Sequence, residues 1–74
     1  MAITLKAARI NANLTQAAAL QAYSDQSGKT ISQSTLIKWE QNKTFPTVQQ
    51  FKVLCRIYGV EMDDIFVPET LTQR

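Results

Sequence analysis

The chain contains 74 residues, of which 45% are hydrophobic and 19% are charged, and its formal net charge is +2. This length allows one small hydrophobic core but not a typical enzyme cleft with its scaffold, and the composition argues against a disordered chain or a coiled coil. With one cysteine, no histidine, no signal-peptide pattern and no apolar run long enough to cross a bilayer, the sequence predicts a cytoplasmic protein without a disulfide, metal or membrane span.

The first two predicted helices each begin at a threonine. Thr4 can cap a helix that extends to about Ala12, and Asn13 is a suitable left-handed residue after it. Thr15 is the predicted cap of a second helix that begins at Gln16. The apolar positions of these helices are Leu5, Ala8 and Ala12 in the first and Ala19, Leu20 and Tyr23 in the second.

A polar segment separates the second helix from the third. Residues 24–30, Ser-Asp-Gln-Ser-Gly-Lys-Thr, have the clearest loop composition of the chain. A longer second helix that ends near Gln26 is equally compatible with this segment. Ser32 is the predicted cap of the third helix, and Ile31 precedes it at the position of a hydrophobic staple.

The third and fourth helices carry the strongest core signals. The third is predicted over residues 33–41, with Leu36 and Trp39 facing inward. Thr47 and Gln50 have the spacing of a capping box for the fourth helix. The apolar positions of the fourth helix and its glycine stop are Val48, Phe51, Leu54, Cys55, Tyr58 and Gly59.

A short fifth helix is predicted over residues 61–66, and Pro68 ends it. No segment has a convincing strand alternation. The sequence therefore predicts an all-α bundle of about five short helices, with one domain over residues 1–67 and a flexible tail over residues 68–74.

The charges are unevenly distributed along the chain. Seven of the eight basic residues lie within residues 1–56, whereas four of the six acidic residues follow Gly59. A polyanionic partner would therefore meet the first three quarters of the chain, although a random scatter of few charges is an alternative.

The ordered set of these features resembles the phage repressor and Cro-type (Xre-like) helix-turn-helix family. The matching residues are Leu5, Ala8-Arg9, Leu14-Thr15-Gln16, Ile31-Ser32, Ser34-Thr35, Trp39-Glu40, Phe45-Pro46, Tyr58-Gly59-Val60 and Asp63-Asp64-Ile65-Phe66. No single piece is diagnostic, but together they cover residues 4–67. The resemblance implies a lambda-repressor-like domain that lays the helix at residues 33–41 in the major groove of double-stranded DNA.

The resemblance also assigns contacts to individual residues. The residues at base-facing positions are Gln33, Ser34, Ile37 and Lys38. The Gln33 side chain suits adenine, and that of Ser34 suits several bases. Ile37 suits a thymine methyl group, and Lys38 suits guanine or phosphate. The residues expected near phosphates are Gln16, Lys29, Thr30, Thr35, Asn42 and Lys43. The alternatives are a polar first turn without base contacts, a solvated Lys38, and a core or partner contact for Ile37.

The family pattern further implies an ion pair between Arg9 and Glu40, whereas the alternative is an exposed arginine and an unrelated glutamate.

The sequence departs from the family pattern in two places. About six extra residues stand between the second and third helices, around residues 23–30, and they are either an inert insertion or an added phosphate contact. Asn13 and Asn42 occupy positions where glycine is frequent, and asparagine also tolerates a left-handed backbone.

We therefore predict a DNA-binding transcriptional regulator, a repressor of phage or mobile-element type, that binds a two-fold operator as a homodimer. The candidate dimer surface comprises the fourth and fifth helices with Phe66, Val67 and Leu71. The main alternative is a protein-interaction module, antitoxin-like or an anti-repressor partner, with weak DNA binding. An enzyme is disfavoured, because no catalytic residues, cofactor motif or phosphate-binding loop can be identified.

Overall fold

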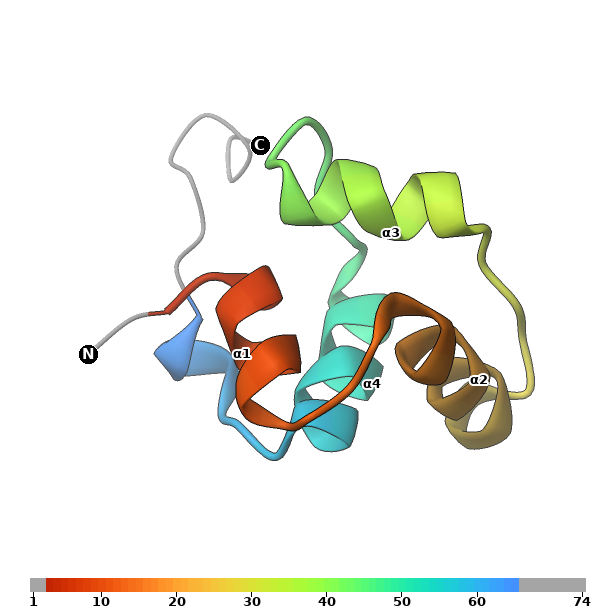
Figure 1. The fold of residues 1–74 in the computed structure, drawn as a ribbon, viewed down its shortest axis with the longest axis horizontal. Helices are drawn as coiled ribbons and strands as arrows, with labels where there is room; N and C mark the ends of the chain where they lie inside the picture. Colours follow the sequence, from red (N-terminus) through yellow and green to blue (C-terminus); the bar gives the residue numbers. More distant parts are fainter. Residues whose placement is uncertain (1–2, 66–74) are drawn as a thin grey trace.

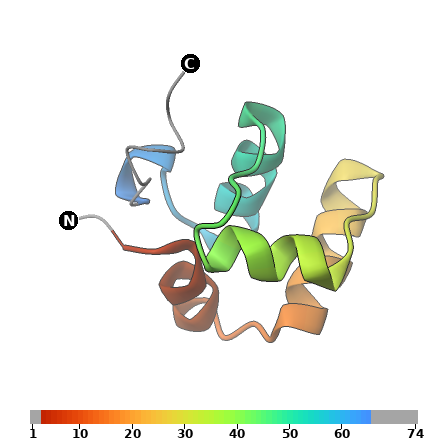
Figure 2. The same ribbon diagram turned by 90° about the horizontal axis from the view of Figure 1, so that it is seen from above.

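The computed structural model describes residues 3–65. Its helices are α1 (Leu5–Asn11), α2 (Gln16–Ser27), α3 (Gln33–Glu40), α4 (Val48–Tyr58) and the 3-10 helix η1 (Met62–Asp64). In Figure 1, α1 and α2 lie on either side of α4, and α3 runs along the edge of the molecule above them. Figure 2 shows the same α3 from above, where it reaches from the α1 side to the α2 side. The predicted all-α fold is confirmed for the described residues.

Local side-chain chemistry starts each α-helix. A threonine or serine hydroxyl accepts a hydrogen bond from the third backbone N–H of every one of them. The four caps are Thr4, Thr15, Ser32 and Thr47, as predicted, and Gln50 completes the capping box of α4. Each such cap stabilises its helix by about 1 kcal/mol.

Left-handed residues follow the helices. Asn13 and Asn42 both have a φ of 61°, which confirms the left-handed backbone predicted for these asparagines. Gly28 ends α2 with a φ of 75° and Gly59 ends α4 with a φ of 71°. The chain therefore reverses where its sequence lowers the cost of a positive φ.

One core joins all the helices. Its buried members are Leu5, Ala8, Ala19, Tyr23, Leu36, Trp39, Phe51, Leu54, Cys55, Tyr58 and Ile65. Trp39, Cys55 and Tyr58 are core residues as predicted, whereas the inward position predicted for Val48 is wrong, because that side chain is 64% exposed. Val48 is the first residue of α4, one turn before the buried stretch that begins at Phe51.

The loop predicted for residues 24–30 is wrong over its first half, and the longer second helix is the one observed. α2 continues through Ser27, whose hydroxyl donates to the Tyr23 carbonyl at 2.7 Å. The Gln21 amide donates to Asp25 at 3.0 Å one turn along the helix. Because Tyr23 is buried, packing continues the helix through residues whose composition favours a loop. Only residues 28–32 connect α2 with α3.

The fifth element is shorter than predicted. It is a 3-10 helix of three residues, and an isolated parallel bridge between Ile3 and Ile65 follows it. The Ile3 N–H donates to the Asp64 carbonyl at 2.8 Å, a contact that the sequence did not indicate. Phe66, Val67, Leu71 and the predicted tail over residues 68–74 lie outside the described residues. Within residues 3–65, no helix is both long and apolar enough to cross a membrane.

Candidate nucleic-acid interface

α3 presents a polar face to solvent and an apolar face to the core. Gln33 and Ser34, in its first turn, are exposed, as is Lys38 in the next turn. Ile37 is half-buried between them and the core. Leu36 and Trp39 are buried on the opposite face. The four predicted base-facing residues therefore share the side of α3 that is not packed on the core.

A hydrogen bond connects the first turn of α3 with the start of α2. The Gln33 Nε2 group donates to Gln16 Oε1 at 3.1 Å. Gln16 Nε2 in turn donates to Glu40 Oε1 at 3.3 Å. Gln16 thereby contacts both ends of α3 and fixes the direction in which the Gln33 amide points.

The end of α3 is held by a buried ion pair with α1. Arg9 Nε lies 2.7 Å from Glu40 Oε2, and the two side chains are 9% and 4% exposed. Arg9 also donates from Nη2 to Glu40 Oε1 at 3.3 Å and from Nη1 to the Leu14 carbonyl at 2.8 Å. The hydrogen bond that Arg9 donates to the Glu40 carboxylate raises the pKa of Arg9 against the opposing effect of burial. The Arg9 guanidinium therefore stays charged, and the pair fixes where α3 leaves the core.

Two connectors flank α3. Lys29 and Thr30 are exposed before it, and Asn42 and Lys43 are exposed after it. The Lys43 N–H donates to the Lys38 carbonyl at 2.9 Å, which folds the second connector back on the helix. The predicted phosphate contact Thr35 differs from these four, because its side chain is half-buried and its hydroxyl lies 2.9 Å from that of Ser32.

A short helix with an exposed polar first turn, braced by a preceding helix that begins at a glutamine, is the arrangement of a helix-turn-helix. The helix-turn-helix family model HTH_3 matches residues 5–65. The chain belongs to the Cro/C1-type (Xre-like) helix-turn-helix family. This family consists of DNA-binding transcriptional regulators. No curated protein and no solved structure matches the chain.

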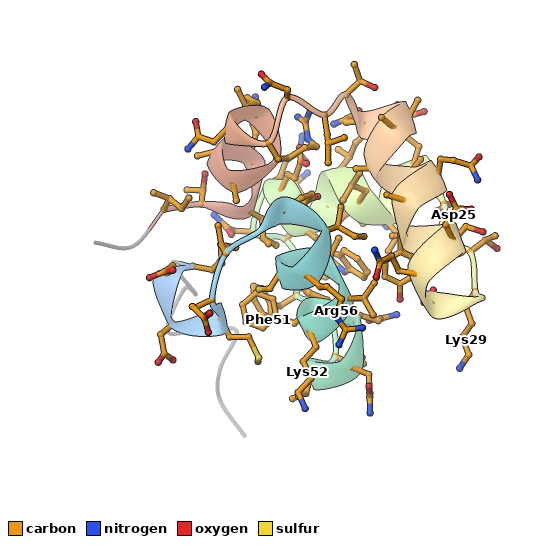
Figure 3. All side chains as sticks on the ribbon, turned by 90° about the horizontal axis from the view of Figure 1, so that it is seen from below. Asp25, Lys29, Phe51, Lys52 and Arg56 are labelled. Carbon is orange, nitrogen blue, oxygen red and sulfur yellow. The ribbon has the colours of Figure 1, made fainter. Side chains whose placement is uncertain are left out.

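Basic residues of this helix-turn-helix domain are not confined to the α3 side. Lys38 and Lys43 are exposed at α3. Figure 3, seen from below, shows Lys52 and Arg56 on α4, on the side of the molecule away from α3. Net charge along the sequence therefore did not identify one DNA-facing surface, and the hydrogen-bonded network at α3 is the more specific signal.

The lengthened α2 also forms a feature that the sequence did not indicate. An open groove of about 530 Å³ lies between the end of α2 and the start of α4. The residues that line it are Tyr23, Gln26, Ser27, Lys29, Thr47, Gln49, Gln50 and Val53. Asp25 and Lys29 mark this end of α2 in Figure 3. Residues 26–29 thus lie beside α4 and apart from the Gln16–Gln33 contact.

Two buried titratable groups of α4 lie in the core of the domain. Burial raises the pKa of the Cys55 thiol, so it remains a protonated core residue. Burial, reinforced by the charge of Glu40 and opposed by that of Arg9, raises the pKa of Tyr58 to about 12. The Tyr58 hydroxyl is buried and has no hydrogen-bond partner among the described residues. The sequence predicted Tyr58 at an apolar position of the fourth helix but gave no sign that its hydroxyl would be buried without a partner.

Proposed function

We propose that this domain is a repressor of phage or mobile-element type that binds a specific double-stranded DNA operator in the cytoplasm and reads its major groove with α3. The hydrogen bond from Gln33 to Gln16 is the observation that carries the proposal. It orients an exposed amide at the N-terminal turn of α3, where helix-turn-helix proteins contact base edges.

The Gln33 amide retains the groups that adenine requires. One of its two Nε2 hydrogens is given to Gln16 Oε1, so the second hydrogen and Oε1 remain for a ligand. A glutamine binds adenine bidentately, donating to N7 and accepting from N6. An amide held in one orientation loses less conformational entropy on binding, so Gln16 preorganises this contact.

The neighbouring side chains supply further contacts in this proposal. Ser34 offers a hydroxyl to a base edge, Ile37 an apolar contact for a thymine methyl group, and Lys38 a cation for guanine or phosphate. The residues proposed to contact phosphates are Gln16, Lys29, Thr30, Thr35, Asn42 and Lys43. Phosphate contacts position the domain, whereas base contacts select the sequence.

A homodimer on a two-fold operator is the assembly that suits such a small module. A single α3 covers few base pairs, and two copies would bind half-sites roughly 34 Å apart on the same side of the duplex. We place the dimer surface at α4, η1 and the residues that follow, including Phe66, Val67 and Leu71. A regulatory protein partner that blocks this surface or the operator-binding face would provide control.

Selection from a random duplex library at about 150 mM salt tests the proposal. We expect enrichment of a palindrome, followed by a steep loss of affinity as salt rises, because phosphate contacts release counterions. Replacing Lys38 or Lys43 by alanine should reduce the salt slope by about one unit if that lysine contacts a phosphate. Weak binding without sequence preference would contradict the proposal and favour the protein-interaction module.

A further inference from the structure

The groove between the end of α2 and the start of α4 has almost no part in the proposed operator contacts. Of the residues that line it, only Lys29 is assigned to DNA. Its volume of about 530 Å³ is within the range of about 300–1,000 Å³ that is typical of ligand sites. Figure 3, seen from the side opposite α3, shows Lys29 at the end of α2 and, beside it, α4 with Lys52 and Arg56. A ligand in the groove would therefore leave α3 free to bind DNA.

The walls of the groove contain no acidic side chain among residues 3–65. Lys29 is the charged residue that lines it, and the other lining residues are neutral. α4 has no acidic residue at all. Asp25, the only acidic residue of α2, does not line the groove, and it accepts a hydrogen bond from Gln21 at 3.0 Å. Nothing on these two helices therefore offsets positive charge at the groove.

Two further cations stand on the exposed face of α4. Lys52 and Arg56 are exposed and one helical turn apart. Arg56 also follows the groove residues Gln49 and Val53 by seven and three positions, so the three share a face of the helix. Within residues 3–65 the salt bridge is the one between α1 and α3, so neither Lys52 nor Arg56 has an acidic partner there. The groove is thus bordered by positive charge from both helices.

The lining of the groove suits a peptide better than a nucleic acid. The buried Tyr23 and the half-buried Val53 supply apolar contact. The exposed side chains of Gln26 and Gln49 each offer a donor and an acceptor, which match the N–H and C=O groups of a peptide backbone. A DNA duplex is too wide to enter a groove of this volume, whereas a short peptide segment can lie along it.

We propose that this groove binds an acidic segment of a partner protein, whose carboxylates pair with Lys52 and Arg56 while an apolar side chain contacts Tyr23 and Val53. The inference goes beyond operator binding and does not depend on it, because it uses the other side of the domain. Exposed ion pairs add little affinity each, so the charges select the partner and speed its association. The apolar and amide contacts within the groove then hold the segment in place.

Peptide selection against the full chain tests the inference without DNA. The probe is a random library of displayed peptides of about twelve residues, screened at about 50 mM salt, where charge attraction is only partly screened. We expect the enriched peptides to carry several acidic residues beside an apolar one, and their affinity should fall as salt rises. No enrichment, or enrichment of basic or uncharged peptides, would overturn the inference.

An isosteric substitution tests where the selected peptide binds. Gln49→Glu places a carboxylate in the groove with almost no change of shape, and it should weaken binding of the best peptide roughly tenfold by repulsion. Gln41→Glu makes the same change at an exposed position beyond α3, and it should leave the affinity within about twofold of the wild type. Equal effects of the two substitutions would show that the peptide does not occupy the groove.

Charge reversal tests the cations of α4 in the same way. Lys52→Glu and Arg56→Glu should each weaken the peptide roughly tenfold. Lys6→Glu reverses an exposed lysine of α1 and is the matched control, with an expected change within about twofold. All of these side chains are exposed, so the melting temperatures should match that of the wild type. If Lys6→Glu weakens the peptide as much as the α4 variants do, only net charge matters and the inference is wrong.

Two measurements distinguish other occupants of the groove. A duplex of random sequence should not displace the bound peptide, since α3 lies on the other side of the domain. Displacement would show that this face binds nucleic acid, and it would overturn the inference. Sedimentation should give the same oligomeric state for the wild type and Gln49→Glu. If that substitution dissociates a dimer, a second copy of the chain fills the groove instead, and the inference is again wrong.

The proposed function fails by a different result. If the wild type selects no operator from the duplex library, the repressor proposal is contradicted, and the peptide selection still decides whether the groove takes an acidic segment. If an operator is selected but no acidic peptide is, the inference fails and the proposed function stands.

Discussion

The two ends of α3 differ in almost every physical respect. Its first turn, with Gln33 and Ser34, is exposed and polar, whereas Trp39 near its other end is buried and Glu40 is paired with Arg9. A helix of eight residues is too short to be stable alone in water. The last turn therefore holds the helix in place, and the first turn is free to present side chains to a ligand.

Two hydrogen bonds through Gln16 connect the two ends of α3. The Gln33 amide is tied through Gln16 to Glu40, so the exposed end is oriented by the buried end. Substitutions at the two ends should thus have separable effects. Those in the last turn should reduce stability, and those in the first turn should change DNA recognition in a folded protein.

The largest effect is expected for Trp39→Ala. Deleting this buried side chain leaves a cavity beneath α3 and should reduce the free energy of unfolding by about 3–5 kcal/mol. Urea denaturation followed by far-UV circular dichroism measures it, since Trp39 is the single tryptophan and its fluorescence disappears with the substitution. A loss below about 1 kcal/mol would show that the last turn is not the anchor.

Glu40→Ala should have an effect of similar or slightly smaller size. It leaves the Arg9 guanidinium buried without its carboxylate, which costs about 3–5 kcal/mol in comparable pairs. The double variant Arg9→Met/Glu40→Met should recover most of that stability, because neither charge is then left alone. A double-mutant cycle of denaturation measurements gives the coupling, and independent effects would contradict the ion-pair model.

Gln33→Ala should leave stability within about 0.5 kcal/mol and change recognition instead. If Gln33 binds adenine, its removal should cost about 1–3 kcal/mol of discrimination at one base pair. Titrating the variant against single-base operator variants, with Gln41→Ala as a control just beyond the helix, measures this. If Gln33→Ala and the wild type had the same specificity profile, the first turn of α3 would not determine DNA recognition through Gln33.

Ser34→Ala is expected to have the smallest effect. Its exposed hydroxyl supplies one hydrogen bond at most to a base, so affinity should fall by about 0.5–1.5 kcal/mol with stability unchanged. Parallel melting and binding curves measure both quantities. A marked decrease in melting temperature would show that Ser34 contributes to stability, as the residues in the last turn of α3 do.

Local features of this fold could be predicted from the sequence, whereas contacts between distant segments could not. The caps at Thr15 and Ser32 and the turn at Asn42 depend on neighbouring residues, so their spacing was sufficient. The end of α2 was ambiguous, because residues 24–27 have loop composition, whereas the buried Tyr23 just before them packs α2 on the core.

The same difference between local features and distant contacts applies to the candidate site. Arg9 and Glu40 are 31 residues apart, and their pairing came from the family resemblance and not from any spacing. The hydrogen bond between Gln16 and Glu40 and the ion pair between Arg9 and Glu40 depend on the angles between α1, α2 and α3. These angles follow from packing of the whole core, which a single sequence does not display.

The bridge between Ile3 and Ile65 makes the described part of the chain almost a closed ring. The 2.8 Å hydrogen bond from the Ile3 N–H to the Asp64 carbonyl brings the start of the first helix beside the end of the last element. A circular permutant could therefore join these ends with a short linker and open the backbone elsewhere, for example in the exposed connector at Gly28. Such a rearranged chain would keep every helix and the network at α3 while moving its termini to the far side of the core.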